Sequence, residues 1–238
     1  MGQLDFSKVD DLFDKPTAEK FIQRRKERGL LITVEDGEQR IDLGDHQAVI
    51  QRLTWKEIQP CGHVGVDRRC ESRIAGLQDK LQDHMKTAEK IWSTEIEGAC
   101  AEKAVSKFRG LEWDETVGKF QRGGDVGNWT QVRHTLDNQG SLKYRSWTCE
   151  NKPYVCVTGE LGWYLLHGWI WGFKAKQRPV SWPTNNPAWV VFQKDLEPMD
   201  TLPPEPEFEV GKKVSDELLC RIMNWSPEYL AEEKRWDH

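Results

Sequence analysis

The chain has 238 residues, 37% of them hydrophobic, and a formal net charge of −5, so it is long enough to bury a core of its own. It contains no run near the about 18 apolar residues that a membrane-spanning helix needs, which predicts a protein outside the membrane. Six scattered cysteines without a Cys-x-x-Cys pair, and an N-terminus without a basic region followed by an apolar stretch, favour a reduced, cytoplasmic protein.

The first region, residues 1–86, is expected to hold a helix and a small hairpin. Apolar residues recur at helical spacing over 17–29, between a proline and a glycine that suit the two ends of a helix. Two β-favouring runs, 30–34 and 39–43, flank the Asp-Gly dipeptide at 36–37. That dipeptide between such runs is a strong hairpin signal.

Further local patterns follow the hairpin. Thr54, with Glu57 three residues later, predicts a capped helical turn. Arginines 68, 69 and 73 with Lys80 form a small basic group, which is either a solvated face or a grip for phosphates. Zinc ligand types are also present here, but their spacing fits no standard zinc module. These residues are Cys61, His63, Cys70 and His84.

The second region, 87–196, is expected to form the core. A helix is predicted over 87–109, before Gly110, because small and apolar residues recur at intervals of three and four. Short β-favouring segments then alternate with Gly, Asn and Pro. These segments are 116–120, 129–135, 142–147, 154–158, 163–173 and 189–193. The pattern predicts an α+β fold in which a long helix packs on a mostly antiparallel, twisted sheet.

The last region, 197–238, is predicted to be a Pro-rich acidic linker followed by short C-terminal helices. The middle of the chain differs from it in charge. Residues 97–196 contain 13 Lys and Arg against 10 Asp and Glu, and eight of the 12 tryptophans. A basic, Trp-rich segment is compatible with a surface that follows a nucleic-acid backbone and stacks bases, although tryptophans in strands also fill cores.

A glycine turn carries a lone carboxylate, Asp125, immediately before an alternating strand. Residues two apart on a strand share a face, so Gln131 and Arg133 can converge with Asp125 while Val132 points to the opposite side. A carboxylate, an amide oxygen and a cation at this spacing are suited to a hard divalent metal and a phosphate. The alternative is a turn aspartate next to a solvated strand face.

Several segments resemble, in chain order, a group of uncharacterised phage and metagenomic proteins, over roughly residues 90 to 200. Those proteins are similar to remote members of the PD-(D/E)XK nuclease-like superfamily, in which a helix glutamate, a strand aspartate and an acidic-x-lysine strand bind magnesium and activate water. The segments that carry the resemblance are 98–105, 124–127, 131–133, 157–159 and 168–172.

The resemblance implies roles for four residues. Glu102 takes the helix carboxylate, Asp125 the main metal ligand, Gln131 the second strand ligand and Arg133 the position of the catalytic lysine, with Mg²⁺ or Mn²⁺ as the cofactor. Glutamine offers a neutral oxygen, and arginine stays protonated, so it can hold a phosphate but hardly act as a base. Glu97, on the inward face of the predicted helix, is an alternative metal ligand to Glu102. For both glutamates, the alternative to metal binding is an exposed helix carboxylate.

These expectations lead to a phage-type protein that acts on DNA or RNA in the cytoplasm, that of the host cell if it is phage-encoded, by metal-dependent phosphodiester hydrolysis. The alternative is a non-catalytic protein with a degenerate nuclease-like fold that binds nucleic acid or a host protein. The replacements at Gln131 and Arg133 favour this alternative. A third hypothesis is carbohydrate recognition by exposed tryptophans.

Overall fold

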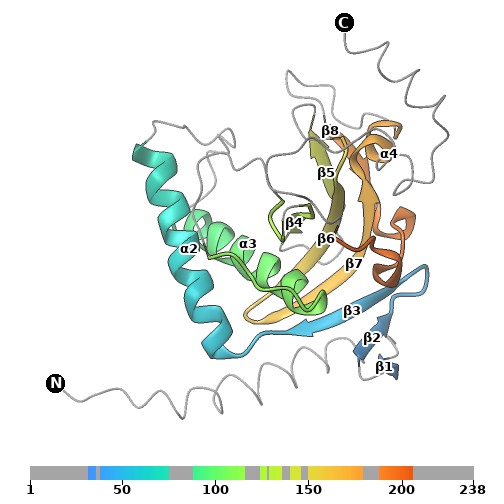
Figure 1. The fold of residues 1–238 in the computed structure, drawn as a ribbon, viewed down its shortest axis with the longest axis horizontal. Helices are drawn as coiled ribbons and strands as arrows, with labels where there is room; N and C mark the ends of the chain where they lie inside the picture. The colour runs from blue at the N-terminus through green and yellow to red at the C-terminus, as the bar shows by residue number, and fades with distance from the viewer. Residues whose placement is uncertain are drawn as a thin grey trace, which may run out of the picture. The chain divides into compact units, whose positions relative to one another are not determined.

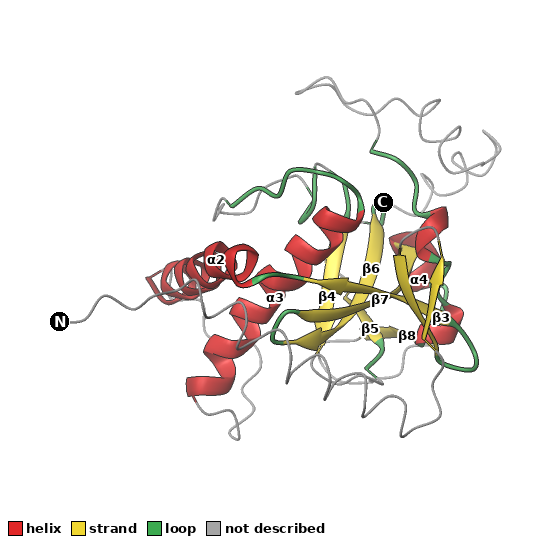
Figure 2. Ribbon diagram, turned by 90° about the horizontal axis from the view of Figure 1, so that it is seen from below, coloured by secondary structure: helices red, strands yellow, loops and turns green. Residues whose placement is uncertain are grey.

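The computed structural model describes residues 32–35, 38–74, 88–115, 124–127, 129–135, 140–145, 150–178 and 188–205. The chain divides into one unit of residues 1–202 and a second of residues 203–238. Helices and strands of the first unit form an α+β fold, as predicted, in which two long helices lie on one side of a mixed sheet (Figures 1 and 2). None of the helices in the described ranges is long and apolar enough to cross a membrane.

The main sheet has six strands in the order β1-β2-β3-β7-β6-β4. Neighbouring strands are antiparallel except β4 and β6, which run parallel. The strands are β1 Ile32–Glu35, β2 Glu38–Asp42, β3 Gln47–Arg52, β4 Gln131–Thr135, β6 Pro153–Glu160 and β7 Trp163–Trp171. Two further strands, β5 Leu142–Arg145 and β8 Ala188–Val191, pair with each other in a separate antiparallel sheet.

The centre of the sheet is the β6–β7 hairpin, which is buried along almost its whole length. A continuous apolar run, rather than an alternating one, is what a strand covered on both faces requires. The two strands join at Leu161 and Gly162, which both have positive φ, at +53° and +83°. Two consecutive left-handed residues match the right-handed twist of a hairpin, so this tight turn fixes the register of the two central strands.

The helix α3, Ala88–Phe108, agrees with the helix predicted over 87–109. Its small residues Ala101 and Ala104 are fully buried, and it lies between the sheet and the second long helix, α2, Trp55–Ile74 (Figure 1). The start of α2 is tied to the end of α3 by an ion pair of 2.9 Å between Glu57 and Lys107, so the two helices run antiparallel.

The prediction of a single capped turn after Thr54 was wrong in length, because α2 has 20 residues. The cap itself is present: the backbone N–H of Thr54 donates to the Glu57 carboxylate at 2.7 Å. The buried stripe of α2 consists of three residues, Cys61, Val64 and Gly65, which is too short a pattern to reveal a long helix, and Pro60 lies inside it. Packing against α3 maintains a helix that its own sequence hardly signals.

Other boundaries differ in detail. The strand predicted over 163–173 ends at Trp171, because a short helix, α4 Gly172–Lys176, begins there. The strand β3 was not predicted, whereas the hairpin around 36–37 is present as β1 and β2. The predicted helix at 17–29, the predicted strand at 116–120, and most of the linker and terminal helices predicted for 197–238 lie outside the described residues.

Candidate functional site

Four charged side chains from four parts of the fold lie in one region beside α3. Arg68 comes from α2, Glu102 from α3, Asp125 from the turn before β4, and Arg133 from β4 itself. We call these four residues the arginine–carboxylate cluster. Two negative and two positive charges give the cluster a formal charge of zero when all four groups are ionised.

Glu102 and Arg68 form a bidentate pair, in which Nη1 and Nη2 of the arginine each donate to one carboxylate oxygen at 2.7 Å. The side chain of Glu102 is only 10% exposed and that of Arg68 28%. Burial and, less strongly, the nearby charge of Asp125 raise the pKa of Glu102 to about 7, against the opposing effect of Arg68. Burial lowers the pKa of Arg68, but its bonds to Glu102 outweigh this, so its pKa lies above the ordinary value.

Asp125 is held by a very short hairpin. Val126 and Thr130 exchange two backbone hydrogen bonds, and this fold of the chain brings the Asp125 carboxylate to the backbone N–H of Val132, which donates to it at 2.8 Å. Gly124 lies against the returning chain, because a Cβ there would be 2.6 Å from the backbone nitrogen of Thr130. The turn therefore needs glycine at this position and fixes the direction of Asp125.

Arg133 faces the same volume as Asp125 and Gln131. Its Nη1 lies 3.4 Å from Asp125 Oδ2 and its Nη2 lies 3.4 Å from Gln131 Oε1. The guanidinium also donates to the carbonyl of Val132 at 2.8 Å and lies over the ring of Tyr154, 5.1 Å from the centroid. Of the four residues that the resemblance singles out, the structure thus brings Asp125, Gln131 and Arg133 into contact, while Glu102 is within the electrostatic influence of Asp125.

Glu97 lies apart from the cluster. Its carboxylate accepts a hydrogen bond of 2.5 Å from the hydroxyl of Tyr164 and one of 3.3 Å from the backbone N–H of Leu161. Burial raises the pKa of Glu97. Five residues along a helix correspond to a rotation of about 140°, so Glu97 and Glu102 point to different neighbours. As an alternative metal ligand, Glu97 is therefore not placed beside Asp125.

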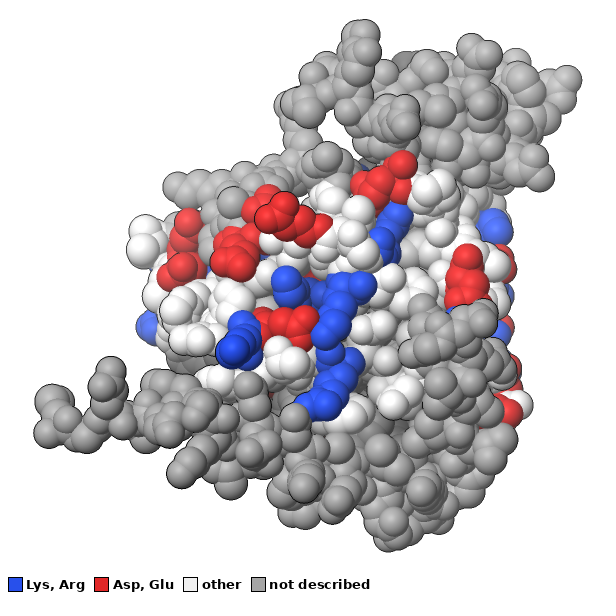
Figure 3. All heavy atoms as spheres, turned by 60° about the horizontal axis from the view of Figure 1, so that its bottom comes forward, with Lys and Arg blue, Asp and Glu red and all other residues white. Residues whose placement is uncertain are grey.

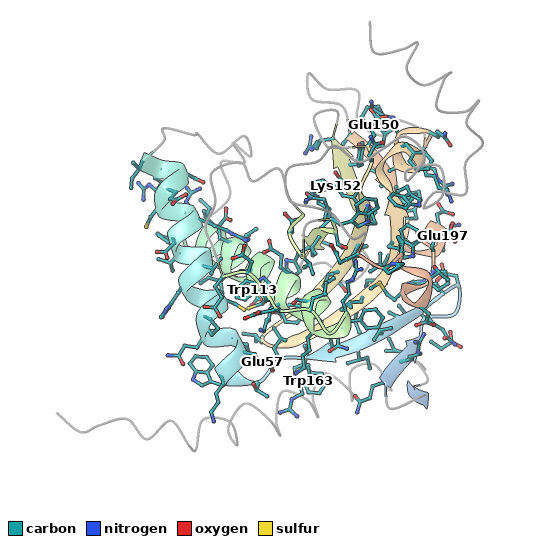
Figure 4. All side chains as sticks on the ribbon, in the orientation of Figure 1. Glu57, Trp113, Glu150, Lys152, Trp163 and Glu197 are labelled. Carbon is teal, nitrogen blue, oxygen red and sulfur yellow. The ribbon has the colours of Figure 1, made fainter. Side chains whose placement is uncertain are left out.

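Two members of the site were not identified from the sequence. Arg68 was seen only as part of a basic group, and its role depends on α2 being long and packed on α3. Trp113, labelled in Figure 4 beside α3, is only 4% exposed. Its indole N–H is directed towards Glu102 as a hydrogen-bond donor and lowers the pKa of that carboxylate.

The histidines and cysteines in the described ranges do not form a metal site. Within the described ranges, no three His, Cys, Asp or Glu side chains come close enough to hold a metal ion, and His84 lies outside these ranges. His134 faces away from Arg133, with its Nε2 2.8 Å from the carbonyl of Gly159, and burial lowers its pKa. His167 lies between His46 and Thr158, at 3.0 and 2.7 Å.

The oxygen atoms of Glu102, Asp125 and Gln131 are the hard donors that Mg²⁺ and Mn²⁺ prefer. The charge of Asp125 contributes to the raised pKa of Glu102, so the two carboxylates act on each other electrostatically. In the described structure each carboxylate instead contacts an arginine.

Comparison with known proteins does not add to these observations. No family model, no curated protein and no solved structure matches the chain. The chemistry of the arginine–carboxylate cluster is therefore argued from its own residues and distances.

Proposed function

We propose that the protein binds nucleic acid at the arginine–carboxylate cluster and hydrolyses a phosphodiester bond with the help of Mg²⁺ or Mn²⁺. The observation that carries this proposal is that Asp125, Gln131 and Arg133 meet at one point, with the buried carboxylate of Glu102 within the electrostatic influence of Asp125. The same four residues, in the same order, are those implied by the resemblance to a PD-(D/E)XK nuclease-like protein. A cytoplasmic location, in the host cell if the chain is encoded by a phage, belongs to this proposal.

The chain supplies the ligands and the phosphate contact. Glu102, Asp125 and Gln131 would hold the divalent cation, which supplies Lewis acidity and lowers the pKa of water. Arg133 is fixed by the Val132 carbonyl and the Tyr154 ring, and is 34% exposed. A fixed guanidinium at an accessible position is suited to bind two oxygens of a phosphate and to stabilise negative charge that develops there.

Arginine remains protonated, so Arg133 takes no proton in this scheme. The proton of the attacking water passes to solvent. The scheme thus divides the work between Arg133, which would orient the phosphate, and the carboxylates, which would hold the cation.

A cleavage assay tests the proposal. Single-stranded, duplex and branched DNA and RNA are incubated with the protein and Mg²⁺, Mn²⁺ or Ca²⁺. Asp125→Asn keeps the shape of the side chain and removes its charge, and should abolish cleavage. Glu112→Gln is the matched control, because Glu112 is an exposed carboxylate in the segment after α3. If the wild type cleaves none of these substrates, or if Asp125→Asn cleaves as fast as the wild type, the enzymatic proposal is wrong.

The pairing of charges favours a second candidate, a protein that binds nucleic acid without cleaving it. Arg68 occupies both oxygens of Glu102, and neither Gln131 nor Arg133 can act as a base. On the face shown in Figure 3, Lys and Arg side chains gather around an acidic patch rather than forming a uniformly basic surface.

Binding measured at increasing salt separates this candidate from a host-protein interface. Phosphate contacts weaken steeply with ionic strength, and each lost contact reduces the slope by about one. Arg133→Gln should therefore lower the salt dependence of oligonucleotide binding. Salt-independent capture of a protein partner, without oligonucleotide binding, would instead favour the host-protein alternative.

A further inference from the structure

Each carboxylate of the cluster is already neutralised by an arginine. Glu102 contacts Arg68 through two bonds of 2.7 Å, and Asp125 contacts Arg133 at 3.4 Å. A divalent cation needs the carboxylate oxygens, and a phosphate needs the guanidinium groups. In the structure, these two sets of groups bind each other. The arginines thus occupy the place of the cation, and the carboxylates occupy the place of the phosphate.

Either ligand alone breaks the pair between Arg68 and Glu102. If a cation binds Glu102, Arg68 loses its partner and lies next to the positive charge of the cation. If a phosphate binds Arg68, the buried carboxylate of Glu102 loses its partner. Leaving one member of a buried ion pair without its partner is strongly unfavourable. Both costs disappear when the two ligands bind together, because the cation then neutralises the carboxylates and the phosphate neutralises the arginines.

This inference rests on the proposed function: we propose that Arg68 couples the binding of divalent cation and phosphodiester, because it releases Glu102 to the cation and binds the phosphate itself. The two ligands then bind cooperatively, and each binds weakly alone. Arg68 thus keeps cation binding weak in the absence of nucleic acid.

Arg68 is better suited to this exchange than Arg133. Arg133 is held by the backbone carbonyl of Val132 and by the ring of Tyr154 as well as by acidic and amide oxygens. In the part of the chain that the structure describes, both hydrogen bonds of Arg68 go to Glu102. The charges of Asp125 and Glu95 also raise the pKa of Arg68, so its guanidinium has acidic neighbours other than Glu102.

Trp113 lies at the same place. Its buried N–H acts as a hydrogen-bond donor towards Glu102 and lowers the pKa of that carboxylate. When Arg68 leaves Glu102, this N–H remains as a donor to the carboxylate or to an incoming phosphate oxygen.

Manganese binding, measured by the electron paramagnetic resonance of free Mn²⁺, tests the proposal without relying on activity. Titrations are made with the protein alone and with a saturating single-stranded oligonucleotide carrying phosphorothioate linkages. The variants are Arg68→Gln and Arg68→Lys, which keeps the charge but loses the bidentate fork. Arg73→Gln is the matched control, an exposed arginine near the end of the same helix. Circular dichroism identifies any variant that is not folded.

In the wild type, the oligonucleotide should tighten Mn²⁺ binding by a factor between about 5 and 150, the usual range of coupling between sites. Arg68→Gln should bind Mn²⁺ alone at least about fivefold more tightly than the wild type, and the coupling factor should fall towards one. Arg68→Lys should lie between the two, and Arg73→Gln should behave as the wild type.

The outcomes separate this inference from the proposed function. Equal coupling in the wild type and in the Arg68 variants overturns the inference, while loss of cleavage in Asp125→Asn still supports the function. If the wild type binds neither Mn²⁺ nor the oligonucleotide, both are overturned. If Arg68→Gln does not fold, the comparison of Arg68→Lys with Arg73→Gln decides.

Discussion

A single glycine sets the distance between the two long helices. A Cβ at Gly65 of α2 would lie 2.6 Å from the Cα of Ile96, 2.7 Å from its nitrogen and 2.9 Å from its Cγ1. Two of these atoms belong to the backbone of α3 and have no freedom to rotate away. We therefore expect Gly65→Ala to force α2 and α3 apart, or to leave a clash between them.

Gly62, on the same helix, provides the matched control, since a Cβ there would meet nothing within 4 Å. Alanine in a helix interior is more favourable than glycine by about 0.5–1 kcal/mol, so Gly62→Ala should stabilise the protein by that amount. The same gain applies at Gly65, but overpacking of a core costs about 1–3 kcal/mol. The difference between the two variants isolates the contact and should therefore be about 1–3 kcal/mol.

The free energy of unfolding is measured by urea denaturation, followed by far-UV circular dichroism. Gly65→Ala should be less stable than Gly62→Ala by that difference, with an unchanged dependence on urea. Because Arg68 lies one helical turn after Gly65, the shift of α2 should also weaken the pair with Glu102. If Gly65→Ala is as stable as Gly62→Ala, the close approach of α2 and α3 described above is wrong.

The remaining predictions concern two side chains of the sheet, the partly buried His134 and the buried Tyr164. Burial lowers the pKa of His134 below 6.5, so the folded state favours the neutral imidazole. The stability that His134 contributes is therefore present above pH 6.5 and is lost as the pH falls below that value. The urea midpoint of His134→Gln should change less between pH 8 and pH 5 than the midpoint of the wild type. An equal change would contradict this assignment. Tyr164→Phe removes a hydroxyl donor from the buried Glu97 and should cost about 1–3 kcal/mol at pH 7, measured by urea unfolding. The loss should shrink towards pH 4, where Glu97 takes up a proton, and a loss that grows there would refute the reasoning.

How much of the fold follows from the sequence depends on how local each signal is. The helix α3 and the β1–β2 hairpin were predicted because a long run of small apolar residues and an Asp-Gly turn act within one segment. The helix α2 was underestimated because its buried face is three residues long and its stability depends on α3. Tertiary packing decides such cases, and it leaves little trace in a single sequence.

The candidate site divides in the same way. Asp125, Gln131 and Arg133 lie within nine positions, so strand geometry alone brings them together. Arg68 and Glu102 are 34 positions apart, and their pair depends on how two helices cross. Contacts between residues of one strand can be predicted from their spacing in the sequence. An ion pair between two helices can be predicted only when the packing of the helices is known.

The position of β4 in the strand order has a consequence for what the site can accept. In the described sheet, β4 comes last in the order, next to β6, and carries Gln131 and Arg133. Among the described residues, no further strand pairs with the outer side of β4 in this sheet. Under the proposed function, a nucleic acid that approached Gln131 and Arg133 from that side would be held at an internal point of the polymer, so that neither end would have to be threaded in first.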